Sequence, residues 1–226
     1  ITLGVATLIV VMAVMNGFRA ELVKRILGIN AHVSVAGITT PIENYRTLAQ
    51  TLRHLDGVES AVPVVKGEVL ATANDGHTGA LIHGIFQEDL QNKPLIADAI
   101  RMGSLNNFDK PNAVVIGIRM AHALQLLPGD TIRLISPETT HTFFGAMPRL
   151  KDYTVAAVFD IGMIEYDNSM IFMPMASAQR YFGMENVVTA IEVNMTDPEQ
   201  VEQAVKIIQE STNGKYRVID WKLSNA

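Results

Sequence analysis

One pair of residues in the chain has a spacing that catalysis could use, namely Glu165 and Asp167. On a β-strand, side chains two residues apart point to the same face, so the two carboxylates would lie together. Neighbouring carboxylates can hold a cation, and one of the pair can act as a general acid. The competing interpretation is a turn that carries two solvated carboxylates, and the sequence favours that interpretation.

The rest of the sequence offers little for catalysis or metal binding. The chain contains no Cys, which excludes disulfides, Cys-bound zinc and thiol nucleophiles. The motifs G-x-S-x-G, G-x-G-x-x-G, Walker A and H-E-x-x-H are absent. The net charge of −5, with no basic cluster longer than Lys24-Arg25, argues against nucleic-acid binding. No helix carries histidines at ligand spacing; they are His32, His54, His77, His83, His122 and His141. We therefore predict a non-enzymatic protein without catalytic residues, cofactor or metal.

A long connection at residues 137–152 is the strongest candidate for a binding element. Connections of this length are uncommon unless they carry a function. Its Thr-rich first half can extend as a β-ribbon, and Gly145 permits a tight reversal. Phe143, Phe144 and Met147 would then place large apolar groups on a protruding tip, which is typical of a partner site. The alternative is a loop that folds back and fills gaps in the core.

The first 28 residues differ in character from the rest of the chain. Residues 1–15 are almost entirely apolar, and no charge appears before Arg19. Fifteen apolar residues are fewer than the roughly 20 that span a bilayer. We interpret 1–28 as a truncated transmembrane helix whose extension, the amphipathic run 19–27, leads into the folded part. The alternative is a buried helix of a soluble core.

Two similar β-α-β patterns lie at opposite ends of the folded part. In the first, a strand at 31–38 precedes a helix whose expected start is a capping box of Thr40 and Glu43 with Pro41 at the first helical position. The second pattern has the same order of strand, helix and strand, with Pro198 at the first helical position. We predict that 29–65 and 187–221 form one split α+β subdomain with ferredoxin-like logic.

The middle of the chain, residues 66–186, reads as a mostly-β subdomain inserted into the split unit. Short alternating segments predict strands at 67–73, 79–85, 113–116, 130–136, 153–159 and 170–174. Short helices are expected at 95–102, 118–126 and 176–182. The fold class is therefore α+β, and the inserted part carries the hairpin at 137–152.

Several motifs resemble the LolC/LolE family of lipoprotein-releasing ABC transporter permeases. They are VMNGF at 14–18, GAMPR at 145–149 and IFMPM at 171–175, followed by AQRYF at 178–182. The resemblance covers essentially the whole chain. The last two motifs also resemble the wider group of MacB-like permeases.

The resemblance implies a MacB-like periplasmic domain preceded by part of the first transmembrane helix, in a protein of the bacterial inner membrane. Its implied partners are the ATPase subunit LolD, a second LolC/LolE-type permease subunit, lipoprotein substrates, membrane lipid and the periplasmic carrier LolA. The carrier would bind the hairpin tip, which comprises Phe143, Phe144, Gly145, Ala146, Met147, Pro148 and Arg149. Lipid chains leaving the membrane would follow an apolar path over Met15, Phe18, Leu22 and Ile26.

The tip departs from the family pattern. LolC-type tips read Pro-Met-Gly-Arg-x-Pro, whereas residues 144–149 here read FGAMPR. Residues 178–184 resemble LolE-type subunits, which lack a working carrier hook. A LolC-type, a LolE-type and a hybrid subunit therefore all remain open. A MacB-like efflux or mechanotransmission permease that binds a periplasmic adaptor is the alternative function.

Overall fold

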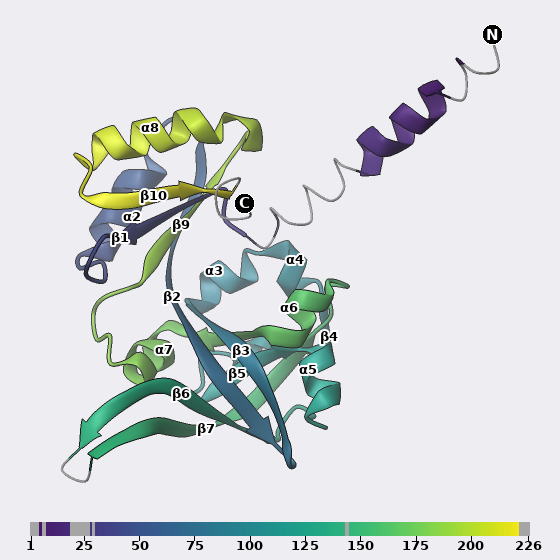
Figure 1. Cartoon of the computed structure of the whole chain (residues 1–226), viewed down its shortest axis with the longest axis vertical. Helices are drawn as coiled ribbons and strands as arrows, with labels where there is room; N and C mark the ends of the chain where they lie inside the picture. Colours follow the sequence, from purple (N-terminus) through teal and green to yellow (C-terminus); the bar gives the residue numbers. More distant parts are fainter. Residues whose placement is uncertain (1–4, 6–7, 19–27, 29, 143–144, 222–226) are drawn as a thin grey trace.

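The structure is a computed structural model that describes residues 5, 8–18, 28, 30–142 and 145–221. A short helical segment at 8–18 projects away from the folded body, as Figure 1 shows. In the parts of the chain that are described, no helix combines the length and apolar character needed to cross a membrane. The folded body is α+β with a sheet-rich core, as the sequence predicts.

The two terminal β-α-β patterns contribute strands to one antiparallel sheet. Its order is β10-β1-β9-β2, so strands from the two ends of the folded part alternate. The elements are β1 (Val33–Gly37), α2 (Tyr45–Arg53), β2 (Val58–Ala73), β9 (Ala190–Met195), α8 (Val201–Ser211) and β10 (Tyr216–Asp220). The helices α2 and α8 lie on one face of this sheet (Figure 1). Their buried side chains, Leu52 and Ile208 among them, join Val33 and Val35 in a shared core.

The start of α2 differs from the predicted capping box. The helix begins at Tyr45, after Asn44 in a left-handed conformation with φ of 50°. Upstream of it, Ile42 pairs with Val188, its N–H donating to the Val188 carbonyl at 2.8 Å. Ile42 is buried, so tertiary pairing holds this segment extended and overrides the local capping signal.

Residues from β2 onward build a second β-rich layer. β2 runs unbroken from Val58 to Ala73, so the two strands predicted on either side of Lys66 are one. The further strands are β3 (Gly76–Ile85), β4 (Ile100–Gly103), β5 (Ala113–Gly117), β6 (Thr131–Thr142), β7 (Gly145–Phe159) and β8 (Met170–Pro174). The pairing runs β2-β3-β8-β5-β7, and β6 pairs with both β7 and β2. These six strands therefore close into a ring, whose interior is filled by side chains such as Ile132 and Tyr153.

Short helices border this ring. They are α3 (Gln87–Gln91), α4 (Pro94–Ala97), α5 (Ile118–Ala123), α6 (Ile164–Ser169) and α7 (Met175–Phe182), with a 3₁₀ turn at Leu105–Asn107. A second 3₁₀ turn, Pro198–Gln200, lies apart from the ring and leads into α8. The helix predicted at 95–102 is wrong in its second half. There the chain turns into β4, which pairs at the sheet edge with β7, so strand pairing replaces the expected helical turn.

Candidate functional site

The connection at 137–152 is the outer part of a long two-stranded ribbon formed by β6 and β7. The antiparallel pairing extends outward to Thr139 opposite Pro148 and Thr142 opposite Gly145. The ribbon reaches beyond the folded body at the lower left of Figure 1. Of the predicted tip, Phe143 and Phe144 lie outside the described residues, and for Gly145 to Met147 only the strand backbone is described.

The ribbon is fastened to the body through Arg149. Its guanidinium donates to the Tyr181 carbonyl, and the Tyr181 hydroxyl donates to the Arg149 carbonyl at 3.4 Å. Tyr181 lies in the last turn of α7, where carbonyl groups lack helical partners and a cation is favourable. Arg149 is therefore an anchor of the ribbon, and Pro148 beside it is exposed.

An exposed apolar row crosses the strands at the base of the ribbon. Leu70 of β2 pairs with Ile135 of β6, and Ile135 pairs with Leu150 of β7, so all three side chains share one face. Leu70 is 40% exposed and Leu150 is 51% exposed. Next to this row, Arg133 forms a two-pronged ion pair with Asp152, with N···O distances of 2.7 and 2.9 Å. The base of the ribbon thus offers a flat, partly apolar surface.

The carboxylates singled out from the sequence do not form a site. Glu165 and Asp167 lie on α6, and residues two apart on a helix point to different sides. Glu165 is exposed, whereas Asp167 is buried and accepts from the Ile161 N–H at 3.1 Å. Burial raises the pKa of Asp167. Within the described ranges, no group of three His, Asp or Glu residues is arranged to hold a metal ion.

The apolar path proposed from the sequence falls only partly within the described residues. Met15 and Phe18 belong to the helical segment 8–18, and both side chains are more than 60% exposed. Leu22 and Ile26 lie outside the described residues. Exposed apolar side chains gathered on one helical segment are typical of a surface that contacts a partner or a membrane.

A group of charged residues that the sequence did not indicate lies where the two β-layers meet. In the sheet β10-β1-β9-β2, four residues on neighbouring strands are register partners and lie side by side: Ile219, Ser34, Glu192 and Val62. This row lies on the face opposite α2 and α8, because Val33 and Val35 point into that other core. Glu192 is therefore a carboxylate on the face that turns toward the second layer, and it is buried.

Three nitrogen-bearing side chains surround Glu192. Its Oε1 lies 2.8 Å from Nζ of Lys66 on β2, and its Oε2 lies 2.9 Å from Nζ of Lys93 in the α3–α4 connection. His83 on β3 is buried, and its Nε2 lies 3.5 Å from Oε2. Among the described residues His83 Nε2 has no partner at hydrogen-bond geometry. One carboxylate of the sheet is thus held by three elements of the second layer.

The surroundings of this cluster lower the pKa values of both Glu192 and His83. Burial alone would raise the pKa of Glu192, but the ammonium groups of Lys93 and Lys66 and the polar contact with His83 outweigh burial and hold that pKa well below 4.5. Burial lowers the pKa of His83 below its ordinary value of 6.5, and the two lysines act in the same direction. Near neutral pH, Glu192 is therefore ionised and the imidazole of His83 is neutral.

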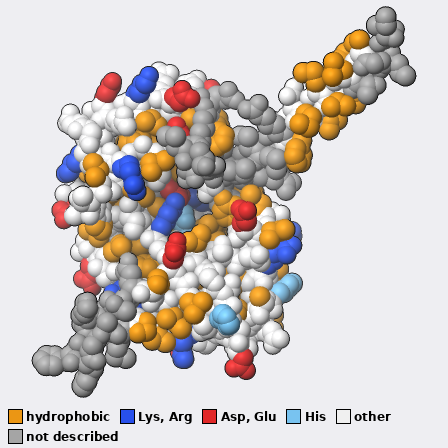
Figure 2. Space-filling model, viewed as in Figure 1, with side chains coloured by type: hydrophobic (Ala, Val, Ile, Leu, Met, Phe, Trp, Pro, Cys, Tyr) orange, Lys and Arg blue, Asp and Glu red, His pale blue; other side chains and the backbone are white. Residues whose placement is uncertain are grey.

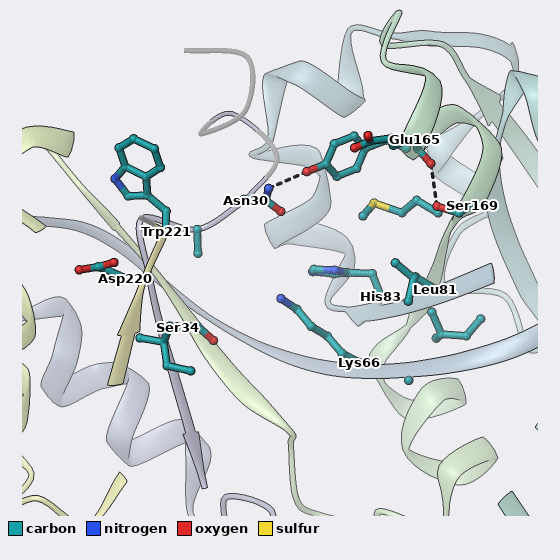
Figure 3. Close-up of a pocket in the computed structure, with 15 residues that line it drawn as sticks. Asn30, Ser34, Lys66, Leu81, His83, Glu165, Ser169, Asp220 and Trp221 are labelled. Atoms are coloured by element: carbon teal, nitrogen blue, oxygen red, sulfur yellow. Dashed lines mark hydrogen bonds between the residues drawn. The ribbon is translucent and has the colours of Figure 1, made fainter. Parts of the chain in front are cut away.

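A cleft with a volume of about 420 Å³ opens above the cluster. One wall carries Ser34 of β1 and Trp221, which follows β10, and the facing wall carries Leu81 and His83, as Figure 3 shows. Ile219 of β10 also lines the cleft. The Asn30 Nδ2 group donates to the Tyr166 hydroxyl at 2.6 Å and joins the two walls. In Figure 2 a hollow lies between the upper and lower parts of the same face, and charged side chains gather around it.

Comparisons with known proteins identify the family to which this architecture belongs. A family model described as the MacB-like periplasmic core domain matches residues 1–211. The chain belongs to this family. Two solved structures share the fold of this MacB-like domain at low sequence identity. The periplasmic region of MacB from Actinobacillus actinomycetemcomitans gives a TM-score of 0.55 at 13% identity, covering 91% of this chain and 96% of that one. The extracellular domain of YknZ, a noncanonic ABC-type transporter from Gram-positive bacteria, gives a TM-score of 0.54 at 16% identity. That alignment covers 83% of this chain and 99% of the YknZ domain.

Curated relatives of the MacB-like domain are named as lipoprotein-releasing proteins. The transmembrane protein LolC of this system from Xylella fastidiosa is 28% identical over 228 residues, which are 100% of this chain and 54% of the relative. LolC from Neisseria meningitidis is 28% identical over 100% of this chain and 55% of its own length. LolE from Haemophilus influenzae is 26% identical over 88% of this chain and 49% of its own length. The resemblance to LolC/LolE-type permeases is thus confirmed, and the chain spans about half the length of these relatives.

The Glu192 cluster makes the stability of the MacB-like domain depend on pH. A buried neutral His83 takes up its proton only on unfolding, so below pH 6.5 the unfolded chain binds more protons than the folded one. His32, whose pKa burial also lowers, acts in the same direction. We expect the free energy of unfolding to fall from pH 6.5 downward, and to fall further below pH 4.5 as the unfolded chain protonates Glu192.

Urea denaturation at a series of pH values checks this expectation. One buried histidine can contribute up to about 1.4 kcal/mol per pH unit. His83→Gln removes one of the two histidines whose pKa burial lowers, so the slope between pH 6.5 and 5 should become shallower. Equal slopes for His83→Gln and the parent chain would show that His83 is not buried in its neutral form.

Proposed function

We propose that this chain is the periplasmic part of an ABC transporter membrane subunit that releases lipoproteins from the inner membrane and passes them to the carrier LolA. The similarity to LolC and LolE relatives along essentially the whole chain carries the proposal. The subunit would work with the ATPase LolD and a second LolC/LolE-type permease. ATP hydrolysis by LolD would drive release, and the present domain would act without catalytic residues of its own.

In this proposal the ribbon of β6 and β7 receives the carrier. Its outer part is paired along both strands, and Arg149 anchors it to α7, so it can present a tip at a defined position. The tip at 143–149 and the exposed row of Leu70, Ile135 and Leu150 would together contact LolA. A rigid two-stranded element loses little conformational entropy on binding, which favours such an arrangement.

The apolar helical segment would guide the lipid chains of the substrate. Met15 and Phe18 are exposed on a helix that is apolar along its length, which suits contact with acyl chains. Met15→Asp with Phe18→Asp should lower the initial rate of lipoprotein release from reconstituted vesicles about tenfold or more, because each buried charge in an apolar path costs about 2.5 kcal/mol or more. Met15→Leu with Phe18→Leu is the matched control. An unchanged rate in the Asp variant would remove the path from the proposal.

A MacB-like efflux or mechanotransmission permease is the second candidate function. The family model and the fold shared with the periplasmic region of MacB support it. In that case the domain would contact a periplasmic adaptor in place of LolA. The shared fold is compatible with both functions.

Crosslinking from the ribbon distinguishes the two candidates. Pro148 is exposed next to the tip, so a photoreactive amino acid there will label what binds the ribbon. The same probe at Asp75, in the exposed turn between β2 and β3, serves as the control. We expect a crosslink to LolA from position 148 and none from position 75. A crosslink from position 148 to a membrane-fusion adaptor, with none to LolA, would favour the efflux function.

A further inference from the structure

The cluster around Glu192 sets two ammonium groups against one carboxylate. Glu192 faces Lys66 and Lys93 at salt-bridge distance, so two ammonium groups share a single carboxylate beside a neutral His83. Lys93 is only 11% exposed and is enclosed by this pairing, whereas Lys66 is 46% exposed. An ammonium group has three N–H donors, so Lys66 keeps donors for a ligand. Figure 3 shows the Lys66 and His83 side chains pointing into the cleft.

The lining of the same cleft also carries a negative charge. Glu165 on α6 lines the cleft and is exposed. Tyr166, the next residue, also lines the cleft. The cleft therefore presents the ammonium group of Lys66 and the carboxylate of Glu165 as separate charges of opposite sign. A ligand that matches both charges carries an anionic group and a cationic group.

The remaining lining is suited to a small amphiphile. Leu81, Met170 and Ile219 contribute apolar surface, and Trp221 stands on the wall opposite Leu81 (Figure 3). Ser34 adds a hydroxyl to the cleft. Aromatic rings in the lining favour an ammonium group, because a cation is attracted to the face of an aromatic ring. A volume of about 420 Å³ is in the range of small-molecule sites.

We propose that this cleft binds a phosphate–amine zwitterion of the phosphoethanolamine type, with the phosphate at Lys66 and the ammonium group at Glu165. The glycerol part of such a ligand would lie against Leu81 and Ile219. This site is separate from the ribbon and from the apolar helical segment, so it stands whether or not the proposed transport function holds. The same chemistry occurs in phospholipid head groups and in free glycerophosphoethanolamine.

The single Trp of the chain gives a direct readout, since Trp221 lines the cleft. Titrating the whole chain with glycerophosphoethanolamine should change its tryptophan fluorescence to saturation. Lys66→Gln should weaken binding about tenfold or more, because it removes a charged hydrogen-bond donor. Lys206→Gln, at an exposed position on α8, should bind like the parent chain. Far-UV circular dichroism confirms that each variant is folded.

Glu165→Gln tests the amine end of the site. This variant should weaken binding of glycerophosphoethanolamine and leave binding of glycerophosphoglycerol, which lacks the amine, unchanged. Vesicles with phosphatidylethanolamine or phosphatidylglycerol then distinguish the source. Lys66-dependent binding to the former identifies a lipid head group, and binding of the soluble compound alone identifies a free ligand. An unchanged fluorescence with millimolar glycerophosphoethanolamine, or equal binding by Lys66→Gln and the parent chain, would overturn the proposal.

Discussion

Replacing Glu192 with Gln should lower the free energy of unfolding by about 3–5 kcal/mol, the cost of leaving one partner of a buried ion pair uncompensated. Lys93 carries this cost, because its ammonium group is nearly enclosed and would face a neutral amide. Lys66 is half exposed and can turn toward water, so it contributes less. Urea denaturation at pH 7 measures the change, and Glu210→Gln on the exposed face of α8 is the matched control.

A double variant separates charge compensation from packing. Glu192→Leu combined with Lys93→Met removes both members of the buried pair and keeps side chains of similar volume. Replacing a buried ion pair by apolar residues is often neutral or stabilising. The double variant should therefore be more stable than Glu192→Gln alone. If the double variant were as unstable as Glu192→Gln, the loss of stability would come from packing around β9 and not from the uncompensated charge.

Shortening the ribbon should weaken LolA binding about a hundredfold or more, if the proposed function holds. Each buried hot-spot side chain contributes about 2 kcal/mol or more, and a factor of ten corresponds to about 1.4 kcal/mol. Replacing residues 139–148 with Asn-Gly removes the outer strand pairs and closes the shortened ribbon with residues that favour a turn. The pairing of Ile135 with Leu150 and the anchor at Arg149 remain. Isothermal titration calorimetry with LolA measures the loss.

The control for shortening keeps the ribbon and changes another hairpin. Asp75 has a positive φ of 64° in the turn between β2 and β3, a conformation that Gly adopts without strain. Asp75→Gly should therefore fold and bind LolA like the parent chain. Undiminished LolA binding by the shortened ribbon would place the carrier contact elsewhere and would fit the LolE-type role.

Much of the strand content could be predicted from the sequence, because these strands carry their own local signals. β5 and β8 are short apolar runs bounded by turns, and the structure places them within one residue of the predicted limits. The Thr-rich arm with Gly145 indicated the extended hairpin in the same way. The closing of the ring was not predicted, because β6 must pair with β2, some 60 residues away, and a local pattern carries no such information.

The Glu192 cluster shows most clearly where sequence reasoning ends. Its members come from β2, β3, the α3–α4 connection and β9, and only the pairing of β9 with β1 and β2 brings them together. A signal was present, since Glu192 is a charged residue within the otherwise mostly apolar strand Ala190–Met195. The sequence predicts an alternating strand at 187–195, and such a pattern does not show what covers its polar face. A second layer packs on that face, so the carboxylate is buried and requires partners.

Transfer of lipoprotein in reconstituted membranes tests the central claim most directly. Vesicles would contain a labelled lipoprotein, LolD, the partner permease and the complete subunit of this chain, with LolA outside. We expect ATP-dependent appearance of lipoprotein bound to LolA with the parent subunit, and almost none with residues 139–148 replaced by Asn-Gly. In the proposed function the ribbon takes no part in ATP hydrolysis, so hydrolysis should continue in both samples. Equal transfer by both subunits would contradict the account.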